Sequence, residues 1–143
     1  MRLRKLLVIG VSTLCGILTV SLGAQSLPTR FNVPFEFSVS GKTTMPAGEY
    51  SVRTLDGNGL LEIQAADGGK TAFTLTHNGG TSALRDSAKL AFHRYGKQYF
   101  LAEYSERGSQ NECYELPESK AEREAVKIAS ARTLETVTLV AMR

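Results

Sequence analysis

The chain has 143 residues, of which 42% are apolar and 22% are charged. This composition is typical of one globular domain and is too polar for a protein that crosses a membrane several times. The formal net charge is +3, but the Lys and Arg residues are scattered among acidic ones rather than clustered. We therefore expect no nucleic acid among the partners of this protein.

Residues 1–23 have the layout of a secretory signal peptide. Three basic residues stand among the first five, a nearly uncharged run follows over 6–22, and Ser21 and Gly23 precede a cut before Ala24. An uncleaved anchor is the alternative, but about 17 apolar residues is the lower limit for a spanning helix. We expect cleavage, export to the periplasm or the cell exterior, and one β-rich domain over 24–143. The leader takes three of the 17 basic residues and no acidic one, so 14 basic residues remain against 14 acidic ones.

Cysteine usage points to a fold without an internal disulfide. Cys15 lies in the leader, so Cys113 is alone in the mature chain. We expect Cys113 to be a partly buried small apolar residue, with an intermolecular disulfide as the alternative. Its acidic neighbours Glu112 and Glu115 favour the protonated thiol, which argues against a catalytic nucleophile.

Glycine residues divide the mature chain into short strands. They fall between runs rich in β-branched and aromatic residues, as in strands joined by hairpins. The expected strands are Phe31–Val39, Glu49–Leu55, Leu60–Ala66, Thr71–His77, Ala88–Arg94, Gln98–Tyr104 and Thr136–Met142. This pattern predicts a mainly β fold, an antiparallel meander that closes into a small β-barrel. A β-sandwich is the alternative, because both architectures show the same alternation.

Two details of the strands support these assignments. Apolar residues alternate along Phe31–Val39, but Pro34 has no N–H to donate, so this strand is an edge or is bulged or bent there. The last strand has apolar residues on both faces, which suits a strand buried on both sides that closes the barrel against the first strand.

Loop lengths predict the register of two consecutive hairpins. A four-residue loop over 56–59 pairs Val52 with Ile63, which brings the apolar faces together. A three-residue loop over 67–69, with Gly69 in the left-handed conformation, then brings Ile63 opposite Phe73.

The hairpin around Gly96 carries the candidate binding residues. Its expected register pairs Phe92 with Leu101 and Leu90 with Glu103. The opposite face then displays four side chains: His93, Tyr95, Phe100 and Tyr104. Such a face is either covered by the C-terminal helix or is a contact surface for a partner protein, another copy or an extended ligand.

One short helix is expected before the last strand. Ser119 and Glu122 are spaced as a capping box, in which each side chain satisfies a backbone N–H of the other residue. Apolar residues at helical spacing extend the helix to about Ala131. The apolar face is narrow, so we expect the helix to pack on the sheet as a plug or lid.

The sequence predicts no catalytic residue, no metal site and no cofactor. His77 and His93 are the two histidines, and neither has a companion at metal-ligand spacing. We therefore expect a non-catalytic exported protein that contacts a partner protein or itself. A carrier of a small apolar ligand is the second hypothesis, although inward phenylalanines would fill a barrel of this size. An enzyme whose site leaves no motif is the third.

Several segments resemble a family of small secreted β-barrel proteins of environmental bacteria. These segments are Phe31 to Phe37, Met45 to Val52, Phe92 to Gly96, Tyr99 to Leu101 and Glu115 to Glu124. The resemblance spans nearly all of the mature chain. It implies export and a β-rich fold, and it assigns no functional residue because the family is uncharacterised.

Overall fold

The computed structural model describes residues 27–55, 59–80, 86–108, 113–129 and 134–143, and the leader expected over 1–23 lies outside these ranges. In the described ranges the elements are β1 (Thr29–Val33), β2 (Phe37–Val39), β3 (Thr43–Met45), β4 (Gly48–Thr54), β5 (Leu60–Ala65), β6 (Thr71–Leu75), β7 (His77–Asn78), β8 (Lys89–Tyr95), β9 (Gln98–Ser105), β10 (Cys113–Glu115), α1 (Lys120–Ile128) and β11 (Glu135–Val140). The mainly β class is confirmed, as is the short helix before the last strand. The short strands β3 and β10 were not predicted, and β7 was not separated from the predicted strand Thr71–His77, because two or three residues are too few to show alternation.

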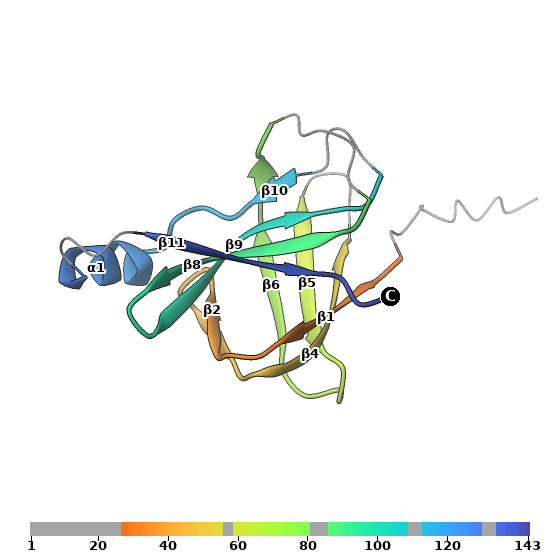
Figure 1. The fold of residues 1–143 in the computed structure, drawn as a ribbon, viewed down its shortest axis with the longest axis horizontal. Helices are drawn as coiled ribbons and strands as arrows, with labels where there is room; N and C mark the ends of the chain where they lie inside the picture. The colour runs from red at the N-terminus through yellow and green to blue at the C-terminus, as the bar shows by residue number, and fades with distance from the viewer. Residues whose placement is uncertain (1–26, 56–58, 81–85, 109–112, 130–133) are drawn as a thin grey trace, which may run out of the picture.

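The strands form two sheets. Sheet A has the order β1-β4-β5-β6, and sheet B has the order β11-β8-β9-β10-β7. The β2–β3 hairpin joins sheet B, because β2 runs parallel to β9 where Ser38 lies beside Phe100. Figure 1 shows the strands of sheet A passing behind those of sheet B at a steep angle, and one sheet curls into a half-barrel.

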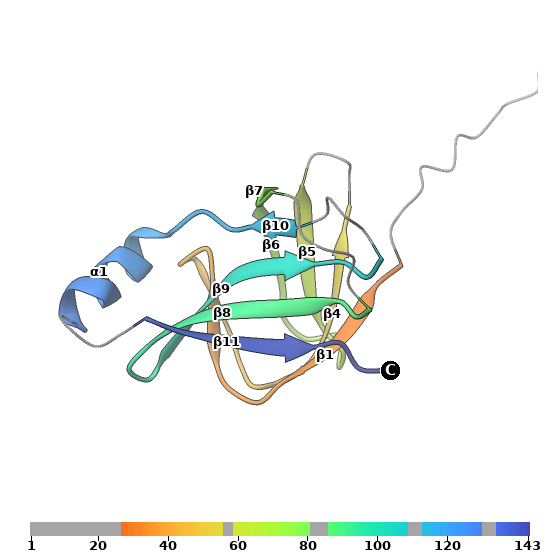
Figure 2. The same ribbon diagram turned by 45° about the horizontal axis from the view of Figure 1, so that its top comes forward.

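The closed barrel predicted from the sequence is wrong. The last strand, β11, pairs along its whole length with β8. It lies near β1 without pairing with it, and just beyond its end the N–H of Met142 donates to the carbonyl of Arg30 at 2.9 Å. Figure 2 shows β11 beside β8, with the C-terminus close to β1. One such bond makes no ladder, so β1 and β11 are edge strands, and Val140 on β11 is 55% exposed rather than buried.

Pro34 separates what the alternation predicted as one strand into two. β1 ends at Val33 in sheet A, and β2 begins at Phe37 in sheet B. The expected bend at Pro34 is therefore confirmed, because a residue without an N–H cannot continue the ladder. The alternation persists through the break, since Phe31, Val33, Phe37 and Val39 are all at most 2% exposed.

The first hairpin of sheet A has the predicted register and the second does not. Val52 lies opposite Ile63 as expected. In the second hairpin Ile63 lies opposite Ala72, because the N–H of Ala65 donates to Lys70 and closes a loop of four residues rather than three. The left-handed glycine of this loop is Gly68, with φ of 77°, and not Gly69. The shift of one residue turns Phe73 and its neighbours on that face of β6 away from the core.

A β-bulge corrects the predicted register of the β8–β9 hairpin. Phe92 lies opposite Leu101 as expected, but the register shifts between Ala91 and Phe92. Leu90 therefore pairs with Tyr104 and not with Glu103. The extra residue in β9 moves the Tyr104 side chain to the inner face, where it is 1% exposed.

Large side chains from both sheets fill the space between them. The largest fully buried ones are Tyr50, Tyr104, Phe31, Phe37, Phe92, Met45, Leu61, Ile63, Leu90, Val33, Val39 and Val52. Edge-to-face ring pairs join the layers, such as Phe37 with Tyr50 at 5.2 Å and Phe37 with Phe92 at 5.2 Å between ring centroids. This geometry is favourable for aromatic pairs, so Phe37 links the two sheets at the centre of the core.

Candidate functional site

The four candidate binding residues of the β8–β9 hairpin do not form one exposed face. His93 and Tyr95 are half-buried, Phe100 is 5% exposed, and Tyr104 lies on the other side of the sheet in the core. Helix α1 lies beside the tip of this hairpin in Figure 1. The alternative in which the helix covers this face therefore agrees with the positions of these side chains. A binding role for the four residues stays a prediction.

Helix α1 is held on this face by a cluster of polar side chains, which we call the Glu122 clamp: His93, Tyr95 and Glu122. Oε1 of Glu122 lies 2.7 Å from Nδ1 of His93 and accepts a hydrogen bond from the Tyr95 hydroxyl at 3.3 Å. Glu122 is 5% exposed. A buried carboxylate needs such partners, because its desolvation is otherwise costly. The clamp therefore fixes the first turn of α1 on the outer face of sheet B.

The clamp also explains the helix start. The hydroxyl of Ser119 accepts a hydrogen bond from the N–H of Glu122 at 3.1 Å, so this half of the predicted capping box is confirmed. The carboxylate of Glu122 bonds instead across to the β8 strand. Of the apolar residues at helical spacing, Ala125 is buried while Ile128 is 83% exposed. The helix is thus held more by polar contacts than by an apolar face.

The clamp changes the acidity of Tyr95. Burial raises the pKa of the Tyr95 hydroxyl, and the negative charge of Glu122 and the hydrogen bond to it raise it further, to about 12. Tyr95 therefore stays a hydrogen-bond donor at any physiological pH. A hydroxyl that holds its proton this firmly is a poor general acid or nucleophile near neutral pH, so the clamp is suited to holding the helix.

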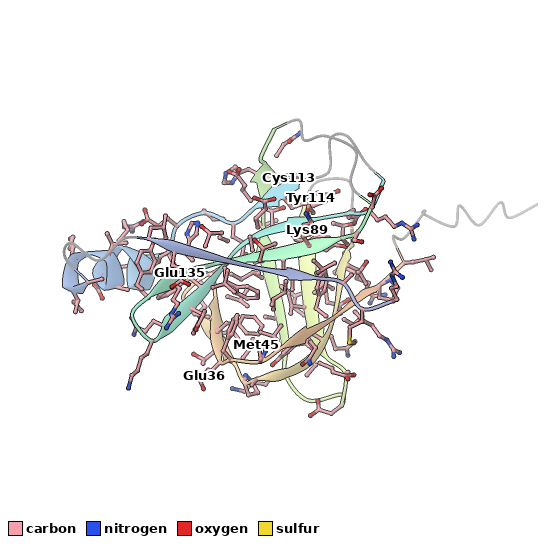
Figure 3. All side chains as sticks on the ribbon, viewed as in Figure 1. Glu36, Met45, Lys89, Cys113, Tyr114 and Glu135 are labelled. Carbon is pink, nitrogen blue, oxygen red and sulfur yellow. The ribbon has the colours of Figure 1, made fainter. Side chains whose placement is uncertain are left out.

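A second polar cluster lies where β7, β9 and β10 meet, and we call it the Cys113 cluster: Glu103, Cys113, Glu115 and His77. One side-chain ligand atom from each of Glu103, Cys113 and Glu115 lies within 4.8 Å of the other two. Nε2 of His77 lies 3.4 Å from Oε2 of Glu115. Figure 3 labels Cys113 on β10. Sequence spacing gave no sign of this cluster, because β10 was not predicted and the four residues come from three strands.

Cys113 itself is 6% exposed. This burial agrees with the expectation that Cys113 is a small apolar residue packed in the fold. An intermolecular disulfide through Cys113 stays a prediction, and it would require the thiol to become accessible to a second chain.

The outer face of sheet A carries an apolar patch that includes Phe73, which the predicted register placed opposite Ile63. Phe73 and Leu75 on the edge strand β6 are 58% and 67% exposed. Leu75 lies opposite Leu60, and the backbone N–H of Leu55 donates to Leu60, so these side chains share one face. We call this set the sheet A patch: Leu55, Leu60, Phe73 and Leu75.

An ion pair borders the sheet A patch. Glu62 lies opposite Phe73 on one side and opposite Arg53 on the other. The guanidinium of Arg53 donates to the carboxylate of Glu62, which is only 9% exposed although it lies on the outer face. The two charges cancel, so the border adds no net charge to the patch.

A wide hollow lies in the described surface and is lined in part by residues of β1 and β4. It has a volume of about 1130 Å³, opens to solvent beside β1 and the C-terminus, and is lined by charged residues of both signs, among them Arg30, Glu49 and Arg143. An apolar ligand prefers an enclosed, mostly apolar cavity. This hollow therefore gives no support to the carrier hypothesis.

Comparison with known proteins adds no assignment. No family model, no curated protein and no solved structure matches this chain. The family resemblance seen in the sequence accordingly stays a prediction. Within the described ranges no helix has the length and apolar character needed to cross a bilayer.

Proposed function

We propose that this chain is an exported, non-catalytic β protein that associates with a second copy of itself through the sheet A patch. The observation that carries the proposal is the exposure of Phe73 and Leu75 on an edge strand. Large apolar side chains gathered on one face are typical of interaction surfaces. The pattern of residues 1–23 supports export, and the expected sites of action are the periplasm or the outside of the cell.

Charge favours a second copy as the occupant. The Arg53–Glu62 pair is neutral as a unit, and the sheet A patch beside it is aliphatic and aromatic. A face without net charge does not repel its own copy, which is what a symmetric dimer requires. The mature chain is also close to neutral, since 14 basic residues remain against 14 acidic ones once the leader is removed.

The contribution of the patch follows from its exposed area. Burial of a whole Phe or Leu side chain is worth about 1.5–3 kcal/mol. At 58% and 67% exposure, Phe73 and Leu75 would each contribute roughly 1–2 kcal/mol. A symmetric dimer buries both residues of both copies, roughly 4–8 kcal/mol in all before the entropic cost of association.

The other two hypotheses lack a comparable feature. A carrier would need space between the sheets, where large aromatic and aliphatic side chains are packed. A catalytic role for His93 is disfavoured because its contact with Glu122 serves to hold the helix.

Sedimentation equilibrium of the purified protein tests the proposal. We expect a dimer for the wild-type chain and at least hundredfold weaker association when Phe73→Ser and Leu75→Ser are combined, which corresponds to about 2.7 kcal/mol. The matched control combines Val140→Ser and Ile128→Ser, two exposed aliphatic positions outside the patch. A wild-type monomer would refute self-association, as would a dimer that survives the patch substitutions. Binding of the monomer to a different protein would identify another occupant and count against the proposal.

A further inference from the structure

We propose that the Cys113 cluster is a binding site for a divalent cation of the zinc type. The inference does not rest on the proposed function, because it concerns β7, β9 and β10 rather than the outer face of sheet A. It rests on four side chains with three kinds of donor atom: the sulfur of Cys113, the carboxylate oxygens of Glu103 and Glu115, and the imidazole nitrogen of His77, which lies beside Glu115.

The sheet registers explain why these residues meet. Glu115 lies directly opposite Glu103 on β9 and opposite His77 on β7. Cys113 lies two positions before Glu115 on β10, and side chains two apart on a strand point to the same face. A backbone hydrogen bond also joins the two segments, since the N–H of Gly79 donates to the carbonyl of Cys113 at 2.9 Å.

The separation of the donor atoms fits a tetrahedral cation after a small adjustment. Zinc bonds to oxygen at about 2.0 Å and to sulfur at about 2.3 Å, which places neighbouring ligand atoms ~3.3–3.5 Å apart. The atoms of Glu103, Cys113 and Glu115 lie within 4.8 Å of one another. The ligand atoms therefore have to move closer together. Side-chain rotations that shift each of the two glutamate carboxylates by about 1 Å bring them to this separation, because β9 and β10 already hold the two backbones in register.

The donor chemistry selects the metal. Thiolate and imidazole ligands favour zinc and its neighbours over magnesium or calcium, which prefer oxygen alone. Two carboxylates disfavour copper(I), which prefers sulfur ligands. Zinc accepts sulfur, nitrogen and oxygen together, so the mixed set fits zinc best.

Electrostatics favour a bound cation at this place. Like charges directly opposite one another on neighbouring strands destabilise a sheet, and Glu103 and Glu115 are such a pair. A divalent cation between them replaces this repulsion by attraction. It also stabilises the thiolate of Cys113, which is only 6% exposed and would otherwise be costly to ionise.

His77 supplies the fourth ligand and the access route. Its side chain is 59% exposed and that of Glu115 is 44% exposed, so the solvent side of the cluster is open to an arriving ion. Nε2 of His77 lies 3.4 Å from Oε2 of Glu115, outside the group of three mutually close ligand atoms, so the imidazole ring would have to turn toward Cys113 to bind the same ion. We therefore assign three ligands to the strand pair β9–β10 and one to β7.

Titration of the reduced, chelator-treated protein with Zn²⁺ and Co²⁺ tests the site. We expect one Zn²⁺ per chain by calorimetry, and with Co²⁺ a thiolate-to-cobalt charge-transfer band together with the intense visible absorption of tetrahedral cobalt. The band should disappear in Cys113→Ser, and zinc affinity should fall at least tenfold in Glu103→Gln, Glu115→Gln and His77→Ala. Glu135→Gln is the matched control, because it removes a carboxylate that pairs with Arg94 elsewhere in sheet B.

Each outcome is decisive. Absence of saturable zinc binding in the wild-type chain would overturn the site, as would affinity that is unchanged in Cys113→Ser or in Glu115→Gln. Unchanged affinity in His77→Ala would overturn the fourth ligand. Circular dichroism shows which variants fold, and if Cys113→Ser does not, the cobalt band of the wild-type chain and the partly exposed Glu115→Gln variant decide. The readouts are stoichiometry and absorption, so they are independent of the dimer test.

Discussion

Replacement of Glu122 by glutamine tests whether the Glu122 clamp holds α1 on sheet B. Glutamine keeps the size of the side chain but removes its charge, so Glu122→Gln isolates the electrostatic part of the contacts with His93 and Tyr95. A hydrogen bond to a charged group is worth about 1.5–3 kcal/mol net, against 0.5–1.5 for a neutral one. The contact to Tyr95 is long at 3.3 Å, so we assign most of the loss to the 2.7 Å contact with His93.

The expected loss in the free energy of unfolding is the difference between these two ranges, about 1–1.5 kcal/mol. For a domain of this size that corresponds to a fall in Tm of roughly 3–8 °C. Urea unfolding at neutral pH, followed by circular dichroism, measures the free energy, and calorimetry measures Tm. Glu124→Gln is the control on the same helix, because its side chain is 59% exposed and its 3.9 Å pair with Lys120 should contribute less than about 0.5 kcal/mol.

A second readout separates the clamp from a general effect on stability. The pKa of Tyr95 should fall below about 12 in Glu122→Gln, because the charge and the charged acceptor are gone. It should stay above its ordinary value, because burial is the largest cause of the shift. Tyrosinate absorption during an alkaline titration follows this change. Equal unfolding free energies for the two glutamine variants, with an unchanged Tyr95 titration, would refute the clamp.

Three further predictions concern the backbone, the register and pH. Gly41 and Gly96 share a φ of 64°, but an added Cβ at Gly41 would lie 2.7 Å from the hydroxyl of the helix cap, whereas nothing lies within 4 Å at Gly96. Thermal unfolding should show a loss of about 1–2 kcal/mol for Gly96→Ala and roughly 2–4 kcal/mol for Gly41→Ala, and equal losses would contradict the close packing. Leu61→Ala should cost about 2–5 kcal/mol because Leu61 is fully buried. At concentrations where the chain is a monomer, Leu75→Ala should change stability by less than about 0.5 kcal/mol, and a large loss there would mean that the β5–β6 register is different. Free tyrosine ionises near pH 10 while folded Tyr95 keeps its proton to about pH 12, so its contribution is intact below about pH 10 and is lost as pH rises to about 12. Tyr95→Phe should make the alkaline fall in unfolding free energy shallower, and an unchanged slope would show that Tyr95 is not its source.

The predictions from sequence that hold are those that depend on neighbouring residues. A proline has no N–H to donate to a ladder, which is why an edge position, a bulge or a bend was expected at Pro34. Ser119 caps the helix through an N–H only three residues away. The register of Val52 with Ile63 follows from a short loop and from two strands that each have one apolar face.

The two polar clusters could not be predicted from the sequence, because each depends on residues that are far apart in the chain. Glu122 fits a capping box by spacing, but its carboxylate bonds to His93, 29 residues away in the chain. The Cys113 cluster depends on β10, a strand of three residues that is ordered by its pairing with β7 and β9. No local pattern marks such a strand.

The sequence by itself determined approximately where the longer strands and the helix begin, because backbone chemistry, turn residues and alternation act over a few positions. Tertiary structure decided which side of β6 faces solvent, which tyrosine enters the core and whether the sheets close. These outcomes depend on single-residue shifts, at the loop before β6 and at the bulge in β9, and each shift reverses every side chain that follows it. The competition between alternative packings of the whole core selects among such shifts, and that competition involves residues far apart in the sequence.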